Sequence, residues 1–118
     1  MQINIKATGV ELTPALSSYV EDKLSLLDKL VENIDGALLD VEIGKITHHH
    51  KTGNWFFAEA NLKFKGKLLR KVSEEADLYA AIDKMKDGLA EEIRKYHRKQ
   101  SSLVKKGGRA LKKLFFRL

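Results

Sequence analysis

The chain has 118 residues with no cysteine and one proline, and it carries a formal net charge of +6 at pH 7. This length fits one domain with its own core, and the lack of cysteine excludes disulfide bonds and thiolate metal sites. We expect a cytoplasmic protein, because the first residues lack the apolar run of a signal peptide and no stretch reaches the length of a membrane span.

The first predicted elements are a strand and a helix. Residues 2–7 alternate between apolar and polar side chains, which is typical of a half-buried strand. Thr13 and Pro14 suit a helix start, because Thr caps free backbone N–H groups and Pro fits the first helical position. Apolar residues follow at helical spacing, so an amphipathic helix is predicted over residues 14–33, ending before Asp35-Gly36.

Three strands are predicted next, over residues 39–44, 55–65 and 68–74. In the second of these, we expect the core face to consist of Phe56, Ala58, Ala60, Leu62 and Phe64. Trp55 and Phe57 then lie on the opposite face, where they meet solvent or a partner. Lys65-Gly66-Lys67 is predicted to form a tight hairpin turn. The alternation in the last strand does not decide which of its faces points inward.

A second helix is predicted over residues 77–99, with an apolar stripe and with Gly88 in its interior. Ser101-Ser102 is interpreted as a linker. We therefore expect the chain to consist of a folded domain, residues 1–100, and a basic tail, residues 101–118, that is flexible or forms an amphipathic helix.

The predicted order is β-α-β-β-β-α. A helix joins the first two strands, which should therefore be parallel, while the later strands form hairpins. Strands with one apolar face need helices on that face only, so the fold class is α+β: a two-layer sandwich with a four-stranded mixed sheet and two helices on one face.

The positive charge is concentrated near the end of the chain. Residues 93–118 contain ten Lys or Arg and no Asp or Glu. Such a one-ended field attracts polyanions, with nucleic acid the first candidate and an anionic membrane the second. A solubilising tail is the simpler interpretation, but solvated surfaces usually mix both signs.

Catalysis and metal binding receive little support. The sequence has no phosphate-binding Gly-rich loop, no nucleophile elbow and no zinc-binding helix motif. We therefore predict no enzymatic activity, no cofactor and no small-molecule substrate. Adjacent side chains in His48-His49-His50 converge poorly on one ion, and His97 is remote in sequence, so no metal site is expected.

Two basic surfaces are candidates for phosphate contacts. On the second helix, Lys84, Gly88, Glu91, Lys95 and Arg98 form a stripe opposite the apolar face. In the tail, apolar and basic residues separate onto two helical faces, a pattern that suits RNA, a protein groove or anionic lipid, so membrane contact through the tail stays open.

Four segments carry a resemblance to a known family. They are I-N-I near the start, V-E-L-T-P-A-L over residues 10–16, Y-V-E-D-K-L-S-L-L-D-K-L over residues 19–30, and E-E-A-D-L-Y-A-A-I-D over residues 74–83. In these segments residues 1–99 resemble the ribosome hibernation promoting factors, also called ribosome-associated inhibitors of translation. The chain is similar to the short class, because it ends before the added C-terminal domain of longer members.

The resemblance implies a fold like that of double-stranded RNA-binding domains. It also implies binding to the small ribosomal subunit, its RNA and proteins, in the channel used by mRNA and tRNA, where occupancy inhibits translation. Four positions that are commonly basic in the family are not basic here: Ser17, Leu26, Gly88 and Glu91. Family-like basic positions are Lys23, Lys29 and Lys95.

We therefore expect a non-enzymatic ribosome-binding protein that contacts phosphates through basic side chains. The predicted contacts are Lys23, Lys29, Lys84, Lys86, Arg94, Lys95, Arg98, Lys99, Lys105, Lys106, Arg109, Lys112 and Lys113. The alternatives are a peripheral membrane protein held by the tail and a generic binder of double-stranded RNA.

Overall fold

The computed structural model describes residues 1–47 and 53–116, and the side chains of residues 1–47 and 53–103. The elements in chain order are β1 (Gln2–Thr8), α1 (Pro14–Ser25), α2 (Asp28–Val31), β2 (Leu38–Ile46), β3 (Trp55–Phe64), β4 (Lys67–Glu75) and α3 (Leu78–Phe116). The predicted α+β order is confirmed, except that the first helix is broken in two.

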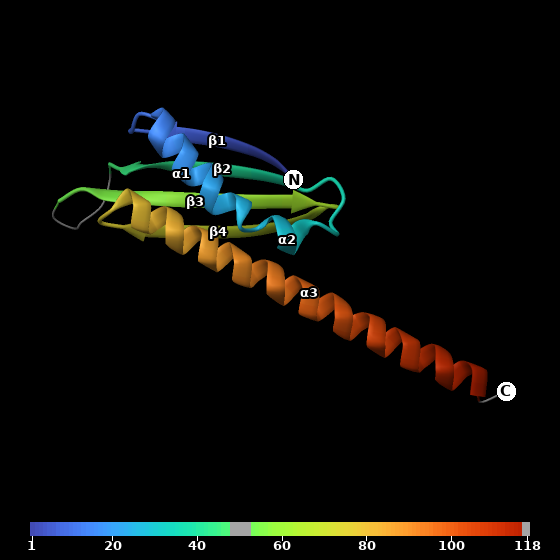
Figure 1. Ribbon diagram of the computed structural model, residues 1–118. Helices are drawn as coiled ribbons and strands as arrows, with labels where there is room; N and C mark the ends of the chain where they lie inside the picture. The colour runs from blue at the N-terminus through green and yellow to red at the C-terminus, as the bar shows by residue number, and fades with distance from the viewer. Residues whose placement is uncertain (48–52, 117–118) are drawn as a thin grey trace.

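The four strands form one mixed sheet in the order β1-β2-β3-β4. Strand β1 pairs in parallel with β2, and β3 pairs antiparallel with both β2 and β4. All helices lie on one face of this sheet (Figure 1). The predicted two-layer sandwich is therefore confirmed, and the other face of the sheet is left without a helical cover.

The core lies between the sheet and the helices. It contains the inward side chains of β2 and β3 and the apolar stripes of α1 and α3, among which Ile43, Leu62, Ile82 and Leu89 are fully buried. On β4, Leu69 and Ser73 point inward, whereas Leu68 and Val72 are exposed. The structure thus decides the orientation of the strand for which the sequence left two possibilities.

The predicted helix over residues 14–33 is wrong in its continuity. The N–H groups of Leu26 and Leu27 donate to the carbonyl oxygens of Lys23 and Leu24, three residues back. These bonds form a tight turn between α1 and α2. The turn leaves Leu26 62% exposed and Leu27 1% exposed, which keeps the apolar stripe on the core.

The predicted end of the last helix near residue 99 is also wrong. Helix α3 continues through Ser101-Ser102 to Phe116, so the serines are not a linker. Neither a proline nor a helix-ending glycine occurs at this point, and serine is only mildly unfavourable within a helix. The helix therefore extends beyond the sheet as a single projecting rod (Figure 1).

On the open face of the sheet, Trp55 and Phe57 are half-buried. Phe57 lies opposite Gly44 of β2, and a Cβ at Gly44 would lie 2.9 Å from its ring. Glycine therefore makes room for the Phe57 ring to pack against the sheet, and a structural role accounts for this aromatic side chain.

Candidate nucleic-acid interface

The net charge of the chain resides in its last fifteen residues. Residues 1–103 contain sixteen basic and sixteen acidic side chains, whereas residues 104–118 contain six basic and no acidic ones. Residues 1–103 are thus formally neutral, and the net positive charge that attracts a polyanion lies at the end of the chain.

Helix α3 carries part of this charged segment away from the body. Among the described residues, the last hydrogen bond between α3 and another element involves His97, whose Nε2 atom lies 2.6 Å from the carbonyl oxygen of Leu30. The helix then continues for 19 residues, about 28 Å at 1.5 Å per residue. We call residues 98–116 the arm. The side chains of Lys105, Lys106, Arg109, Lys112 and Lys113 lie outside the described residues.

Most of the predicted contact residues whose side chains are described already have an acidic partner. Six of the eight described ones form ion pairs: Lys23 with Asp83, Lys84 with Glu75, Lys86 with Asp87, Lys95 with Glu92, and both Arg94 and Arg98 with Glu91. Exposed pairs of this kind contribute little to stability, so a phosphate can replace the carboxylate at small cost. Lys29 and Lys99 have no ion-pairing carboxylate among the described residues.

Two of the four non-basic positions named above have a clear structural setting. Leu26 is exposed in the turn that follows α1. Gly88 is not part of an open stripe, because the side chain of Lys71 from β4 crosses α3 at this position, where a Cβ would collide with it. A cation from the sheet thus lies against the helix at Gly88, which the sequence pattern alone could not reveal.

A polar cluster joins α1 to α3. The hydroxyl of Tyr19 donates to Asp83 at 2.7 Å, and the Nζ atom of Lys23 lies 3.3 Å from the same carboxylate. The Tyr79 ring packs edge-on against Tyr19, with 4.7 Å between ring centres. The hydrogen bond from Tyr19 and the charge of Lys23 hold the pKa of Asp83 below its usual range, and the same hydrogen bond raises the pKa of Tyr19 to about 12.

We expect Tyr19→Phe to destabilise the protein by about 1 kcal/mol at neutral pH, a modest value because Asp83 is partly exposed. A carboxylate with a lowered pKa stabilises the fold above its unfolded-state pKa, about 3.9, and this stabilisation is lost as the pH falls through the folded-state value. The difference between wild type and Tyr19→Phe should therefore shrink between pH 7 and pH 3 in urea titrations.

Tyr79→Phe is the matched control, because it removes the same atom from the neighbouring ring, whose hydroxyl has no hydrogen bond among the described residues. It should leave this pH dependence unchanged. A Tyr19→Phe difference that stays constant between the two pH values would contradict the assignment of Asp83 as the titrating group.

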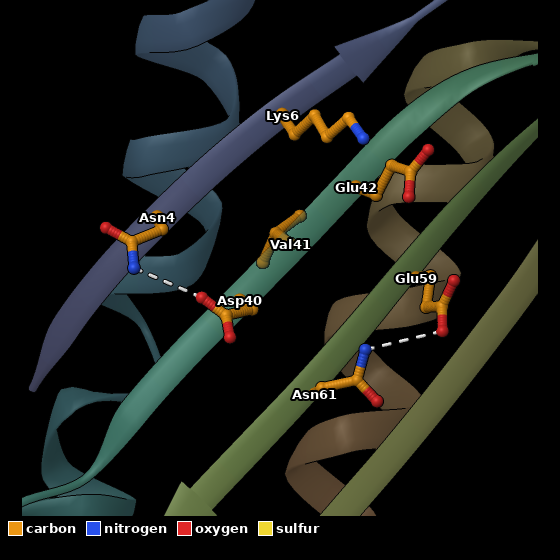
Figure 2. Close-up of a pocket in the computed structure, with 7 residues that line it drawn as sticks. All are labelled: Asn4, Lys6, Asp40, Val41, Glu42, Glu59 and Asn61. Carbon is orange, nitrogen blue, oxygen red and sulfur yellow. Dashed lines mark hydrogen bonds between the residues drawn. The ribbon is translucent and has the colours of Figure 1, made fainter.

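The open face of the sheet has a different character. A shallow pocket of about 270 Å³ lies there, lined mainly by polar side chains from β1, β2 and β3 (Figure 2). Asn4 donates to Asp40, and Asn61 donates to Glu59, which also pairs with Arg70 at 2.9 Å. Asn4 and then Lys63 hold the pKa of Asp40 low. Because the pKa of Asp40 is lowered and both Asp40 and Glu59 already have hydrogen-bond and ion-pair partners, this face suits neither proton transfer nor a polyanion.

The hairpin between β3 and β4 brings unexpected cations to the helical face. Lys67 lies on the inner side of β4, and its Nζ atom is 5.4 Å from the centre of the Tyr96 ring on α3. It shares a shallow pocket of about 390 Å³ with Lys95 and Lys99. The sequence pattern alone predicts only a turn for Lys65 and Lys67. The inward register of Lys67 on β4 was the missing signal.

Two further findings bear on the alternatives. Within the described part of the chain, no three His, Asp or Glu side chains are arranged to hold a metal ion; His48-His49-His50 lie outside it. Although α3 is long, no helix among the described residues is apolar enough over a sufficient length to cross a bilayer.

Comparison with known proteins gives one family. The pattern of the family described as Sigma 54 modulation protein / S30EA ribosomal protein matches residues 3–101. A relative from Klebsiella oxytoca named Ribosome hibernation promoting factor is 33% identical over 96 residues, which cover 81% of this chain and 93% of the relative.

Solved structures agree with the fold. The N-terminal domain of Thermus thermophilus Protein Y is 30% identical, with a TM-score of 0.67 over 81% of this chain and 99% of that one. A ribosomal subunit interface protein from Coxiella burnetii has a TM-score of 0.69 over 83% of this chain and 99% of its own, at 22% identity, and supports the fold alone.

Proposed function

The chain belongs to the Sigma 54 modulation protein / S30EA ribosomal protein family, which includes the ribosome hibernation promoting factors, and we propose that it binds the small ribosomal subunit and inhibits translation. The observation that carries the proposal is the family match, because residues 3–101 include nearly the whole sheet, helices α1 and α2, and α3 as far as residue 101. Its site of action in this proposal is the channel that mRNA and tRNA use, in the cytoplasm.

The mechanism is occlusion. The body is a sheet backed by helices with a continuous apolar core, and such a packed sandwich resists deformation. A rigid body in the decoding channel excludes mRNA and tRNA by volume alone, so inhibition needs neither a catalytic residue nor a cofactor. The polar cluster of Tyr19 and Asp83 supports this role by holding α1 against α3.

The charge distribution supports an RNA partner. Residues 1–103 have no net charge to repel ribosomal RNA, and their basic side chains can exchange carboxylates for phosphates. The arm adds a basic segment that lies outside the compact body. Phosphate contacts from both parts would position the protein without reading base sequence.

Co-sedimentation with purified ribosomes through sucrose gradients tests the proposal, followed by translation in vitro. If about six phosphates are contacted, the logarithm of the binding constant should fall with the logarithm of salt concentration with a slope of about −4 to −5. Translation should decline in proportion to the fraction of ribosomes bound. A slope near zero, or bound ribosomes that translate normally, would count against the proposal.

The same preparation separates the other candidate partners. A generic binder of double-stranded RNA would bind a free duplex as tightly as the ribosome, so competition with duplex should release it. A membrane protein would float with anionic vesicles and leave the ribosome fraction. The proposal expects neither behaviour at physiological salt.

A further inference from the structure

The seam between the β3–β4 hairpin and α3 gathers lysines from two elements that are far apart in the sequence. Lys65 is in the turn, Lys67 is the first residue of β4, and Lys95 and Lys99 are one turn apart on α3. We call these four residues the seam lysines. Two shallow pockets meet here, because Lys67 and Leu68 line both of them.

The seam lysines are poorly neutralised. Glu92 is the acidic side chain in the pocket with Lys67, and it pairs with Lys95 at 3.6 Å. Among residues 1–47 and 53–103, no carboxylate lies within 4.0 Å of Lys65, Lys67 or Lys99. This setting contrasts with the rest of the body, where most predicted contact residues have an acidic partner.

The turn itself does not explain why lysine occupies position 65. Lys65 has a φ of 49° and Gly66 a φ of 73°, so both residues of the two-residue turn are in the left-handed region. Glycine, asparagine and aspartate suit the first of these positions, whereas lysine is unfavourable there. Lys65 therefore contributes its charge at a position where its backbone preference is poor.

We infer that the seam lysines form a second phosphate-binding surface that continues along α3 into the arm. The inference rests on the proposed function and adds Lys65 and Lys67, from the β3–β4 hairpin, to a binding surface otherwise made of helices. Lys67 is held over the Tyr96 ring, whose face attracts cations, so its ammonium group is positioned before a ligand arrives.

The distribution of the basic residues favours an RNA strand over a membrane as the partner. The seam lies where α3 leaves the sheet, and the arm projects from the same end of the molecule (Figure 1). The basic residues of α3 thus follow one another along the helix, as phosphates follow one another along an RNA strand. The seam lysines line shallow pockets. A lipid surface instead favours a continuous apolar face with basic residues at its border.

Lys65→Gln/Lys67→Gln tests the inference in the full-length protein with purified ribosomes. Loss of two phosphate contacts should reduce the magnitude of the salt slope by about 1.4 to 1.8 and weaken binding about tenfold or more at 0.1 M salt. Lys6→Gln/Lys45→Gln removes the same charge from β1 and β2 and should leave the slope unchanged. Lys67→Arg keeps the charge and should bind like the wild type, and thermal unfolding verifies that each variant is folded.

The outcomes separate this inference from the proposed function. If the wild type binds ribosomes and Lys65→Gln/Lys67→Gln has the same slope, the seam is not a phosphate surface, although the proposed function stands. If the wild type does not bind ribosomes, both fail. If it binds vesicles of phosphatidylserine and phosphatidylcholine instead, and the double variant does not, the seam recognises lipid and the RNA assignment is overturned.

Discussion

Replacing the six basic residues of the last fifteen with glutamine should weaken ribosome binding by on the order of a hundredfold or more at 0.1 M salt. The residues are Lys105, Lys106, Arg109, Lys112, Lys113 and Arg117. They carry the whole net charge of the chain, because residues 1–103 are formally neutral. Each phosphate contact contributes about 0.7 to 0.9 to the salt slope, so the slope should approach that of the body alone.

Glutamine is a suitable replacement because its helix propensity is close to that of lysine and arginine. A smaller pair of variants supplies the matched control. Neutralising Lys105, Lys106 and Arg109 should reduce the slope by about 2 to 3. Neutralising Lys6, Lys63 and Arg70 on the open face of the sheet should barely change it. Equal effects of the two triple variants would mean that net charge matters and the position of the arm does not.

The strands were the most predictable part of this fold. Strands β1, β2 and β3 each alternate between apolar and polar side chains, and this alternation identifies a strand and its inner face together. Strand β4 has leucine on both faces, so its orientation depends on the pairing of Leu62 with Leu69, which joins residues across a hairpin. That information is tertiary, and the local pattern does not contain it.

Both errors in the helices concern boundaries. The sequence pattern correctly placed Leu24, Leu27 and Val31 on one face, but it could not distinguish a continuous helix from two helices joined by a tight turn. Spacings of three and four residues fit both arrangements. At the end of α3, Ser101-Ser102 resembles a linker only if local preference decides, and a long established helix tolerates two serines.

The positive charge of the candidate interface could be predicted from the sequence. The set of residues that surround one another in it was less predictable. The concentration of charge near the end of the chain is a property of the sequence. The pairing of Lys23 with Asp83, the position of Lys71 over Gly88 and the approach of Lys67 to Lys95 depend on how separate elements pack together. Such neighbours are separated by more than fifteen residues in the sequence, and no periodic pattern identifies them.

Leu27→Ala should destabilise the fold by about 2 to 5 kcal/mol, whereas Leu26→Ala should change the free energy of unfolding by less than about 0.5 kcal/mol. The two leucines are adjacent in the turn between α1 and α2, yet Leu27 is 1% exposed and Leu26 is 62% exposed. Truncating Leu27 opens a cavity in the layer between the helices and the sheet, where the surrounding side chains relax only partly.

Urea titrations of the two variants measure this difference directly, with far-UV circular dichroism as the signal. The comparison also tests the break in the helix. In an uninterrupted helix, successive residues are separated by 100° around the axis, and both leucines could share the border of the apolar face. Similar losses of stability in the two variants would contradict the turn. A large loss at Leu27 alone would agree with a turn that points one leucine into the core and its neighbour into solvent.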